Sequence, residues 1–503
     1  MTKAQDKTGK GTERPYEELK GILERATSLQ TALVLFEWDN ETLAPKEADA
    51  YTAKMIGSLS EQYMELITSE RVKQLVKSCR EEDLSEVEAA VVREVEEELD
   101  KLSSVPPKEY REFTELTARA TGIWTEAKKK ADFSLFAPTL AKVLEYQKKF
   151  ASYRAKEGQK LYDVMLDSFE KDFTMETLDA FFRELKEGIV PILKDAAERS
   201  RQVDDSFLSA NYPIRAQEEA AHFMAEYVGF DFNRGVLAVS AHPFTTNLHN
   251  HDVRITTHYK KRIDSSLFSV IHESGHALYE FGIRDDLTQT PVGQGTSMGM
   301  HECQSRFFEN ILGRSRAFWE PIYGKIGEIF GEPLRSTPLD DFLAAVNKTI
   351  PGLIRTEADE LSYALHVMVR YEIEKMMIEG QIEMEQLPEI WNQKYEEYLG
   401  VRPKNDAEGI LQDIHWSQGS IGYFPSYALG SAFGAQLYHQ MKKELPVEEL
   451  LRQGRISILR EWLREKIHQY GKLKSSRELL REVTGEDFTP KYYIQYLQEK
   501  YGK

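Results

Sequence analysis

The residues SSLFSVIHESGHALYEF at positions 265–281 are the strongest indication of fold in this sequence. Their apolar side chains return at helical spacing and form one stripe, and Gly282 follows as a C-terminal stop. This stretch is therefore predicted to be an amphipathic helix that packs against a core. It carries the segment His272-Glu273-Ser274-Gly275-His276, which has the pattern H-E-x-x-H.

The two histidines of this segment have the spacing of metal ligands. His272 and His276 lie on one face of the helix and can both reach one zinc ion at about 2.0–2.1 Å. Glu273 stays on the metal side, where it can orient and deprotonate a metal-bound water as general base. Seven of the twelve histidines fall within residues 242–301, which disfavours the alternative of two unrelated histidines on a helix.

A catalytic zinc ion requires a third protein ligand and one open position. The third histidine of the metzincin pattern would fall at position 282, which is a glycine, so that class is excluded. The next predicted helix, residues 298–312, offers three candidates: His301, Glu302 and Glu309. We choose Glu302, because it begins a helix that faces back after the Gly/Thr/Pro-rich return segment 288–299.

Two alternatives concern the neighbours of this third ligand. Glu302 could instead form an ordinary ion pair with Arg306, one helical turn away. Cys303 points about 100° away along the helix, so it is expected to be a buried apolar thiol and not a metal ligand.

The rest of the chain is also predicted to be mostly helical. Glycine (30) and proline (18) are scarce among the 503 residues, and Glu, Lys, Leu and Ala fill long stretches at helical spacing. The exception is a pair of β-like runs, Val236–Val239 and Val253–Thr257, around the loop Ala241–His251. The expected helices are Tyr16–Phe36, Leu84–Leu102, Tyr110–Lys129, Leu135–Tyr153, Met175–Arg199, Ile354–Ile378 and Ile456–Tyr470.

These patterns predict a mainly α protein, one large helical body with a small sheet beside the zinc helix. No linker, repeat or low-complexity run divides the chain. Residues 14–503 are therefore expected to form a single catalytic domain, preceded by residues 1–13 as a disordered N-terminus.

Composition excludes several classes of function and location. Lys and Arg number 65 against 83 Asp and Glu, a net charge of −18, which argues against nucleic acid as a partner. The polar start has no secretory signal, and no apolar run reaches the ~18 residues of a membrane span. Cys79 and Cys303 cannot form a disulfide framework, which fits a reducing compartment and predicts a cytoplasmic location.

Ordered motifs over nearly the whole chain resemble those of the carboxypeptidase Taq family of metallocarboxypeptidases. One departure is Cys303, where that family commonly carries a small residue, and it leaves the ligand assignment untouched. The matching motifs are Trp38-Asp39-Asn40-Glu41-Thr42 with Pro45, His242-Pro243-Phe244, Asp252-Val253-Arg254-Ile255-Thr256, His272 to His276, His301-Glu302-Cys303-Gln304, Ile354 to Asp359 and Gly409 to Trp416.

This resemblance implies a saddle-like helical fold with a deep active-site groove, similar in outline to neurolysin and angiotensin-converting enzyme. It implies release of C-terminal amino acids from peptides with broad specificity, proline being disfavoured. It also implies one zinc ion per chain, with cobalt as a substitute, and a homodimer. An endo-acting helical zinc oligopeptidase is the alternative function, and a non-catalytic zinc or peptide-binding protein is disfavoured because Glu273 is intact.

Two arginines are candidates for binding the substrate's C-terminal carboxylate, since a charged bidentate donor suits that group. Arg355, expected to open a long amphipathic helix, is assigned to carboxylate capture, and Arg254 to the same wall of the groove. The alternative for each is a salt bridge to a neighbouring acid such as Asp359 or Asp252.

Peptide hydrolysis also needs donors for the developing oxyanion. Related helical metallopeptidases use a tyrosine and a histidine in this part of the chain, which implies Tyr423 and His415, with Tyr427 as the less favoured tyrosine. Further residues expected to border the substrate are His242, which could instead cap the turn before Pro243, Gln412 and Asp413.

Overall fold

The structure, a computed structural model, describes residues 14–502, so the disorder expected for residues 1–13 lies outside the described residues. The chain divides into two compact units, one formed by the chain up to Ser103 together with Arg284–Gln294 and the other by Ser104–Ile283 with the remainder from Gly295. Within the described part of the chain, no helix combines the length and the apolar character needed to cross a membrane. A single catalytic domain over 14–503 stays a prediction.

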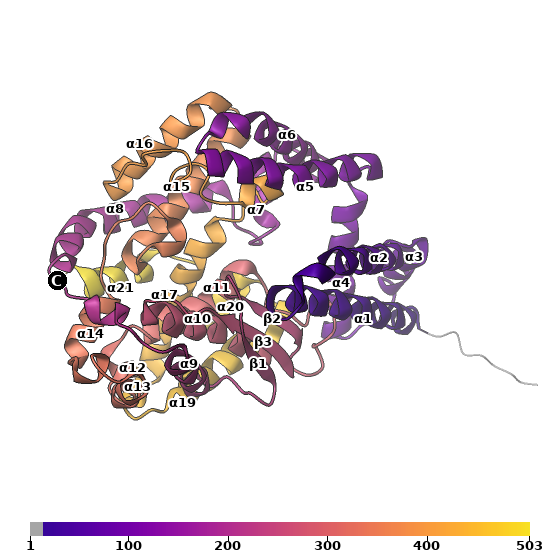
Figure 1. The fold of residues 1–503 in the computed structure, drawn as a ribbon. Helices are drawn as coiled ribbons and strands as arrows, with labels where there is room; N and C mark the ends of the chain where they lie inside the picture. Colours follow the sequence, from indigo (N-terminus) through magenta and orange to yellow (C-terminus); the bar gives the residue numbers. More distant parts are fainter. Residues whose placement is uncertain (1–13, 503) are drawn as a thin grey trace, which may run out of the picture. The chain divides into compact units, whose positions relative to one another are not determined.

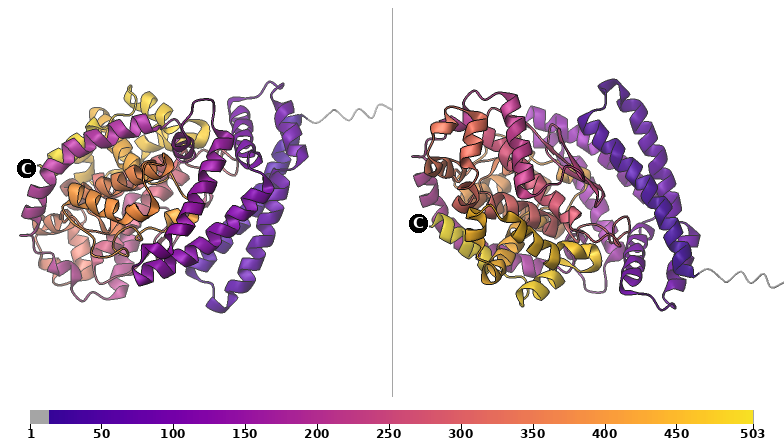
Figure 2. Two further views of the ribbon diagram at one scale, coloured as in Figure 1. Left: turned by 90° about the horizontal axis from the view of Figure 1, so that it is seen from above. Right: turned by 90° about the horizontal axis from the view of Figure 1, so that it is seen from below.

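The first unit is a group of helices drawn in indigo in Figures 1 and 2. Its first helix packs against the second and third, and the third against the fourth. The first begins with a proline and two glutamates, which suit a helix N-terminus. The helices are α1 (Pro15–Thr42), α2 (Asp49–Ile67), α3 (Glu70–Cys79) and α4 (Glu86–Ser103).

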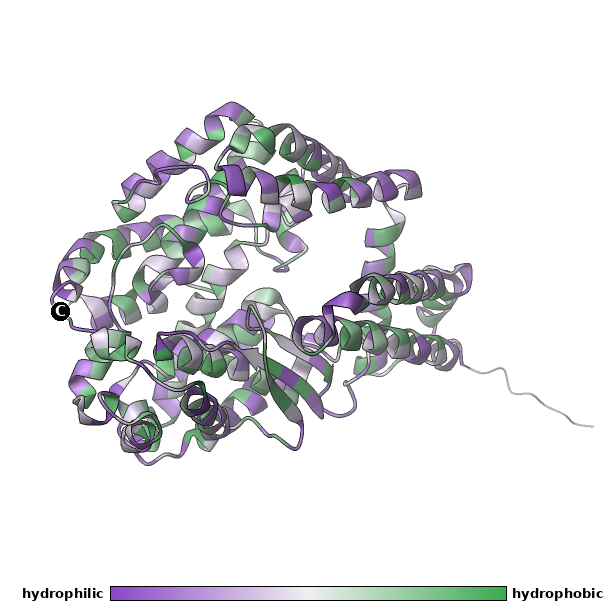
Figure 3. Ribbon diagram, viewed as in Figure 1, coloured by the Kyte–Doolittle hydropathy of each residue, from purple (hydrophilic) through white to green (hydrophobic). Residues whose placement is uncertain are grey.

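The second unit holds most of the helices and one large hydrophobic core. Outer helices such as α6 and α16 mix hydrophilic and hydrophobic residues, as amphipathic helices do (Figure 3). Its α-helices are α5 (Pro107–Lys130), α6 (Ala137–Arg154), α7 (Leu161–Asp167), α8 (Met175–Ser200), α9 (Ile214–Val228), α10 (Ile263–Phe281), α11 (Met298–Arg306), α12 (Arg316–Trp319), α13 (Tyr323–Phe330), α14 (Leu339–Val346), α15 (Glu360–Ile378), α16 (Leu387–Leu399), α17 (Pro425–Glu444), α18 (Val447–Arg452), α19 (Ile456–Lys466), α20 (Ser476–Thr484) and α21 (Lys491–Tyr501).

Three strands of the second unit form one small sheet beside α10. The strands are β1 (Gly235–Val239), β2 (Thr245–His249) and β3 (Asp252–Thr257). Their order is β1-β3-β2; β3 pairs in parallel with β1 and antiparallel with β2. The mainly α fold with a small sheet beside α10 is thus confirmed.

Some predicted element bounds were wrong, each for a local reason. The loop expected at Ala241–His251 contains β2, because Thr245 and its neighbours pair antiparallel with β3. The helix expected to open at Ile354 begins at Glu360, where the side chain of Asp359 accepts the free N–H groups of Leu361 and Ser362. Arg355 lies before it, in a short 3₁₀ turn, η6 (Arg355–Glu357).

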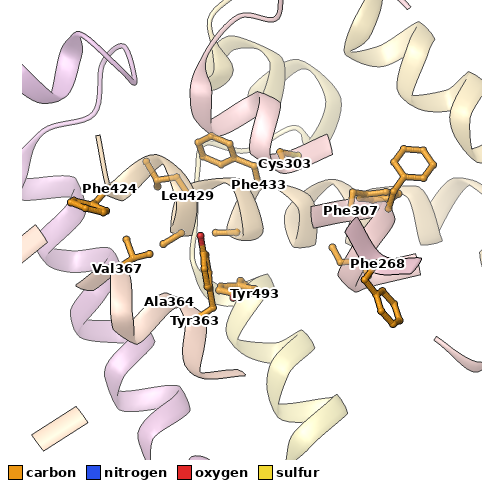
Figure 4. Packing of buried hydrophobic residues seen from close by; sticks show 14 of the residues in the cluster. Phe268, Cys303, Phe307, Tyr363, Ala364, Val367, Phe424, Leu429, Phe433 and Tyr493 are labelled. Carbon is orange, nitrogen blue, oxygen red and sulfur yellow. The ribbon is translucent and has the colours of Figure 1, made fainter. Parts of the chain in front are cut away.

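The centre of the second unit is the packing of α10, α11, α15 and α17. Most residues of α10, α15 and α17 are buried. Figure 4 shows the core between them, with Cys303 of α11 near Phe433 of α17. As expected, Cys303 is a fully buried thiol, and burial raises its pKa. Both Cys79 and Cys303 are free.

Candidate active site

Helix α10 presents the H-E-x-x-H segment against α11. A Cβ atom on Gly275 would lie 2.7 Å from both the carbonyl oxygen of Gln304 and the Cα of Ser305. Only a glycine therefore allows the two helices to approach this closely. The approach places His272 and His276 next to Glu302 of α11.

Glu302 is held on the other side of α11 by α17. A Cβ on Gly430 of α17 would lie 2.7 Å from the Cβ of Glu302. The start of α11 is capped by Ser297, whose Oγ accepts the N–H of Met300 at 3.0 Å. Two close helix contacts and a cap thus determine where the Glu302 carboxylate points.

The three predicted ligands meet at one point. The Oε2 of Glu302 is 3.7 Å from the Nε2 of His272 and 3.7 Å from the Nε2 of His276. All the ligand atoms lie within 4.8 Å of one another. Ligands around a tetrahedral zinc ion at ordinary bond lengths are about 3.3 Å apart, so this donor set fits a divalent metal.

Each histidine also has a partner at its other nitrogen, which is the usual environment of metal-binding imidazoles. The Nδ1 of His272 is 2.8 Å from the Oε2 of Glu309. The Nδ1 of His276 is 3.0 Å from the Nδ1 of His301, whose Nε2 is 2.5 Å from the Oε1 of Glu280. Both Nε2 atoms are thereby directed to the common point.

The predicted ion pair between Glu302 and Arg306 exists together with this arrangement. The Nε of Arg306 donates to the Oε1 of Glu302 at 2.7 Å, while Oε2 faces the histidines. The helix expected over residues 298–312 changes character after Arg306 and continues as a π-helix, η4 (Phe307–Leu312).

The general-base candidate is oriented by a residue of the sheet. Glu273 is 6% exposed, and the hydroxyl of Thr245 on β2 donates to its Oε2 at 2.7 Å. Burial raises the pKa of the Glu273 carboxyl. Sequence reasoning missed Thr245, although it directly follows the motif His242-Pro243-Phe244.

Arg355 is buried and paired, but with Asp413 instead of the expected Asp359. Its Nε and one terminal nitrogen donate to the Oδ1 of Asp413 at 3.0 and 2.9 Å, and the other donates to the hydroxyl of Tyr363 at 3.3 Å. The Tyr363 ring also stacks beneath Arg306, 4.2 Å from the guanidinium carbon. Tyr363 therefore connects Arg355 to Arg306, the partner of Glu302. No sequence signal identified Tyr363.

Gln412 and Asp413 are engaged within the protein. The side chain of Gln412 accepts the backbone N–H of Arg355 at 3.0 Å and donates to the carbonyl of Leu353 at 3.0 Å. Asp413 lies between Arg355 and the fully buried Arg370, whose Nε donates to it at 2.7 Å. Both side chains position Arg355.

Arg254 and His242 lie on or beside the sheet. Arg254 forms a bidentate pair with Asp252 at 2.8 Å for both bonds, which is the expected alternative partner. The side chain of His242 is exposed, and its backbone carbonyl accepts the hydroxyl of Ser240 at 2.7 Å. Their roles in substrate binding stay predictions.

The predicted oxyanion donors form one aromatic group. The ring of His415 stacks on Tyr423 with centroids 5.5 Å apart, and its Nε2 is 3.3 Å from the hydroxyl of Tyr427. Burial lowers the pKa of His415 to about 4, so the ring is neutral at pH 7. Burial raises the pKa of Tyr423, and the negative charge of Glu302 raises it as well.

Comparison with known proteins agrees with this geometry. The sequence profile of the Carboxypeptidase Taq (M32) metallopeptidase family matches residues 18–501. This chain belongs to the carboxypeptidase Taq family. Carboxypeptidase 1 of Bacillus subtilis is 42% identical to it, over 96% of this chain and 97% of the relative.

More distant members of the carboxypeptidase Taq family show the same full-length match. Thermostable carboxypeptidase 1 of Pyrococcus furiosus is 38% identical, over 96% of this chain and 98% of the relative. The crystal structure of a family carboxypeptidase from Deinococcus radiodurans superposes with a TM-score of 0.94 at 33% identity, over 97% of this chain and 99% of that chain. As a member of this family, the protein is a metallocarboxypeptidase, and the family implies a divalent metal ion and peptide substrates.

Proposed function

We propose that this protein is a zinc-dependent carboxypeptidase that releases C-terminal amino acids from peptides with broad specificity, proline being disfavoured. The convergence of His272, His276 and Glu302, with Glu273 beside them, is the observation that carries the proposal. These three side chains would hold one zinc ion per chain, with cobalt as a substitute. When bound, the metal supplies a Lewis acid that activates water and polarises the scissile carbonyl.

Glu273 is the proposed general base. Thr245 occupies its Oε2, which leaves Oε1 for the proton of the attacking water. The same carboxyl then delivers the proton to the nitrogen of the leaving amino acid. The raised pKa of this buried carboxyl helps it to hold the proton between the two transfers.

Arg355 is the proposed binder of the substrate's terminal carboxylate. Among the described residues, Asp413 and Tyr363 take three of its five N–H groups, so one N–H on each terminal nitrogen is left for an incoming carboxylate. Asp413 and Gln412 hold Arg355 in place, and Tyr363 sets its position relative to Arg306. Arg254 and His242 are proposed to border the same substrate.

Tyr423 is the proposed donor to the developing oxyanion, with neutral His415 stacked on it. Tyr427, whose hydroxyl is 3.3 Å from the Nε2 of His415, is the less favoured donor. The groove and the homodimer that the family resemblance implies stay predictions, and so does the cytoplasmic location expected from the two cysteines.

Peptides with free and with amidated C-termini test the function. Metal-loaded protein should release single C-terminal residues from free peptides and leave the amidated ones intact, as followed by mass spectrometry. Cleavage of both sets at internal bonds would favour the alternative, an endo-acting oligopeptidase. Glu273→Gln protein should bind zinc at wild-type stoichiometry and lose activity by roughly 10²–10⁴-fold. Hydrolysis at the wild-type rate would contradict the assigned base.

A further inference from the structure

The helix that carries Glu302 brings a second carboxylate to His272. After Arg306 the chain continues as the π-helix η4, an uncommon structure that is frequent at functional sites. Glu309 lies in this turn, and its Oε2 is 2.8 Å from the Nδ1 of His272. The Oε2 of Glu302 is 3.7 Å from the Nε2 of the same ring. One imidazole is therefore held between two carboxylates of one continuous helix.

The side chain of Glu309 is 12% exposed and contacts two guanidinium groups. A terminal nitrogen of Arg306 is 3.3 Å from its Oε2, and one of Arg314 is 3.4 Å from its Oε1. Two guanidinium groups on one carboxyl stabilise its ionised form, so Glu309 is a carboxylate, which can only accept a hydrogen bond.

Arg306 joins the two carboxylates. It donates from Nε to the Oε1 of Glu302 at 2.7 Å and reaches Glu309 with a terminal nitrogen. The planar guanidinium fixes the distance between them, which a flexible ammonium would not do. Arg306 occupies the Oε1 of Glu302, while Oε2, which also accepts from the hydroxyl of Ser305 at 3.1 Å, faces the two histidines.

His276 has a different partner. Its Nδ1 meets the ring of His301, and the charge of Glu280 is reached only through that second ring. Among the described residues, a carboxylate therefore meets the Nδ1 of His272 directly, whereas the Nδ1 of His276 meets a second imidazole.

We propose that Glu309 is a positioning residue for the metal. Its carboxylate accepts the Nδ1–H of His272 and so stabilises the tautomer whose Nε2 lone pair points at Glu302 and His276. Its negative charge makes this imidazole a stronger ligand. Arg306 and the π-turn hold the carboxylate at the required place. The inference rests on the proposed metal site.

Metal affinity tests the inference directly. Apoprotein is titrated with Zn²⁺ against a chromophoric chelator and, separately, with Co²⁺ alone while its visible absorption spectrum is recorded. Glu309→Gln keeps the size of the side chain and an acceptor oxygen but removes the charge. We expect its Zn²⁺ affinity to fall by about 10–100-fold and its Co²⁺ spectrum to shift.

Glu374→Gln is the matched control. Glu374 is a fully buried carboxyl group of α15 that accepts from Tyr162, Trp416 and the backbone of Gly422, none of which is a proposed ligand. Its variant should keep wild-type Zn²⁺ affinity and the wild-type Co²⁺ spectrum. A loss of affinity shared equally by both variants would mean a general structural effect and would overturn the proposal.

The outcomes separate the inference from the proposed function. Wild-type affinity and spectrum in Glu309→Gln protein overturn the positioning role and leave the metal site intact. Wild-type metal affinity in His272→Ala protein would overturn the proposed site, and the inference with it. Should Glu309→Gln fail to fold, Glu309→Asp withdraws the carboxylate by one methylene and should also weaken Zn²⁺ binding; unchanged affinity in that variant equally overturns the role.

Discussion

Gly430 of α17 lies so close to Glu302 of α11 that a Cβ atom on the glycine would be 2.7 Å from the Cβ of Glu302. Side-chain atoms do not pack this closely, so any other residue at position 430 must push α11 away from α17. Such a shift would move the Glu302 carboxylate relative to the two histidines of α10. The position of the proposed third ligand therefore depends on a residue 128 positions later in the chain.

Gly430→Ala should impair catalysis through this contact. We expect kcat/KM to fall on the order of 10²-fold, because small displacements of catalytic groups have effects of that size, and we expect weaker zinc binding. Gly434→Ala is the control on the same helix, since its Cβ would lie 3.3 Å from the flexible end of Ile311 and should be accommodated. Equal activities of the two variants would contradict the role of the close approach.

Tyr423→Phe should lower kcat with little change in KM. Loss of one oxyanion donor typically costs about 10²–10³-fold in kcat. Steady-state kinetics with one free peptide would compare this variant with Tyr427→Phe, for which we expect a smaller loss. The opposite order would assign the oxyanion to Tyr427.

Arg355→Lys should raise KM for peptides with a free C-terminus. A lysine keeps the charge but lacks the planar guanidinium that can donate hydrogen bonds to Asp413 and to a substrate carboxylate at the same time. Loss of a charge-assisted hydrogen bond predicts a change of about 10–100-fold in KM. Arg262→Lys, which alters a similar pair with Asp264 outside the site, is the control. An unchanged KM in Arg355→Lys protein would remove Arg355 from carboxylate binding.

The buried carboxyl of Glu170 should make stability depend on pH. It accepts from the hydroxyl of Ser297 at 2.7 Å and from the backbone N–H of Gly299 at 2.9 Å, at the start of α11. Burial raises the pKa of Glu170 from 4.5 to about 7. The folded protein therefore keeps this proton where the unfolded chain releases it, and the stabilisation is present below pH 4.5 and lost as pH rises to about 7.

Glu170→Gln should remove this dependence. Urea denaturation of chelator-treated protein at several pH values would measure the free energy of unfolding. Between pH 4.5 and 7 the wild type should lose up to about 1.4 kcal/mol per pH unit through this one proton. The variant should show a slope smaller by that amount. Identical slopes would show that Glu170 does not hold the proton.

The local features of the site could be read from the sequence. The 3.6-residue period of residues 265–281 predicts both the helix and the common face of His272 and His276. Glu302 could be chosen because only a short return segment separates its helix from α10. The β2 strand could not be predicted, because Thr245 to His249 become extended through pairing with β3 and not through their own pattern.

The partners of the predicted residues were decided by packing. Arg355 meets Asp413, and not the nearby Asp359, because Asp359 caps α15 while the segment that follows α16 returns to the arginine. Thr245 reaches Glu273 because β2 lies beside α10.

The helical class, the metal-binding pattern and the candidate for the general base could all be predicted from the sequence, since they depend on spacings of a few residues along one helix. The packing of the folded chain determines which oxygen of Glu302 faces the histidines and which residues hold Glu273 and Arg355. It also determines that a π-turn brings Glu309 to His272. Those relationships join residues that are distant along the chain. They exist because close-packed helices bring particular side chains together, which no local period encodes.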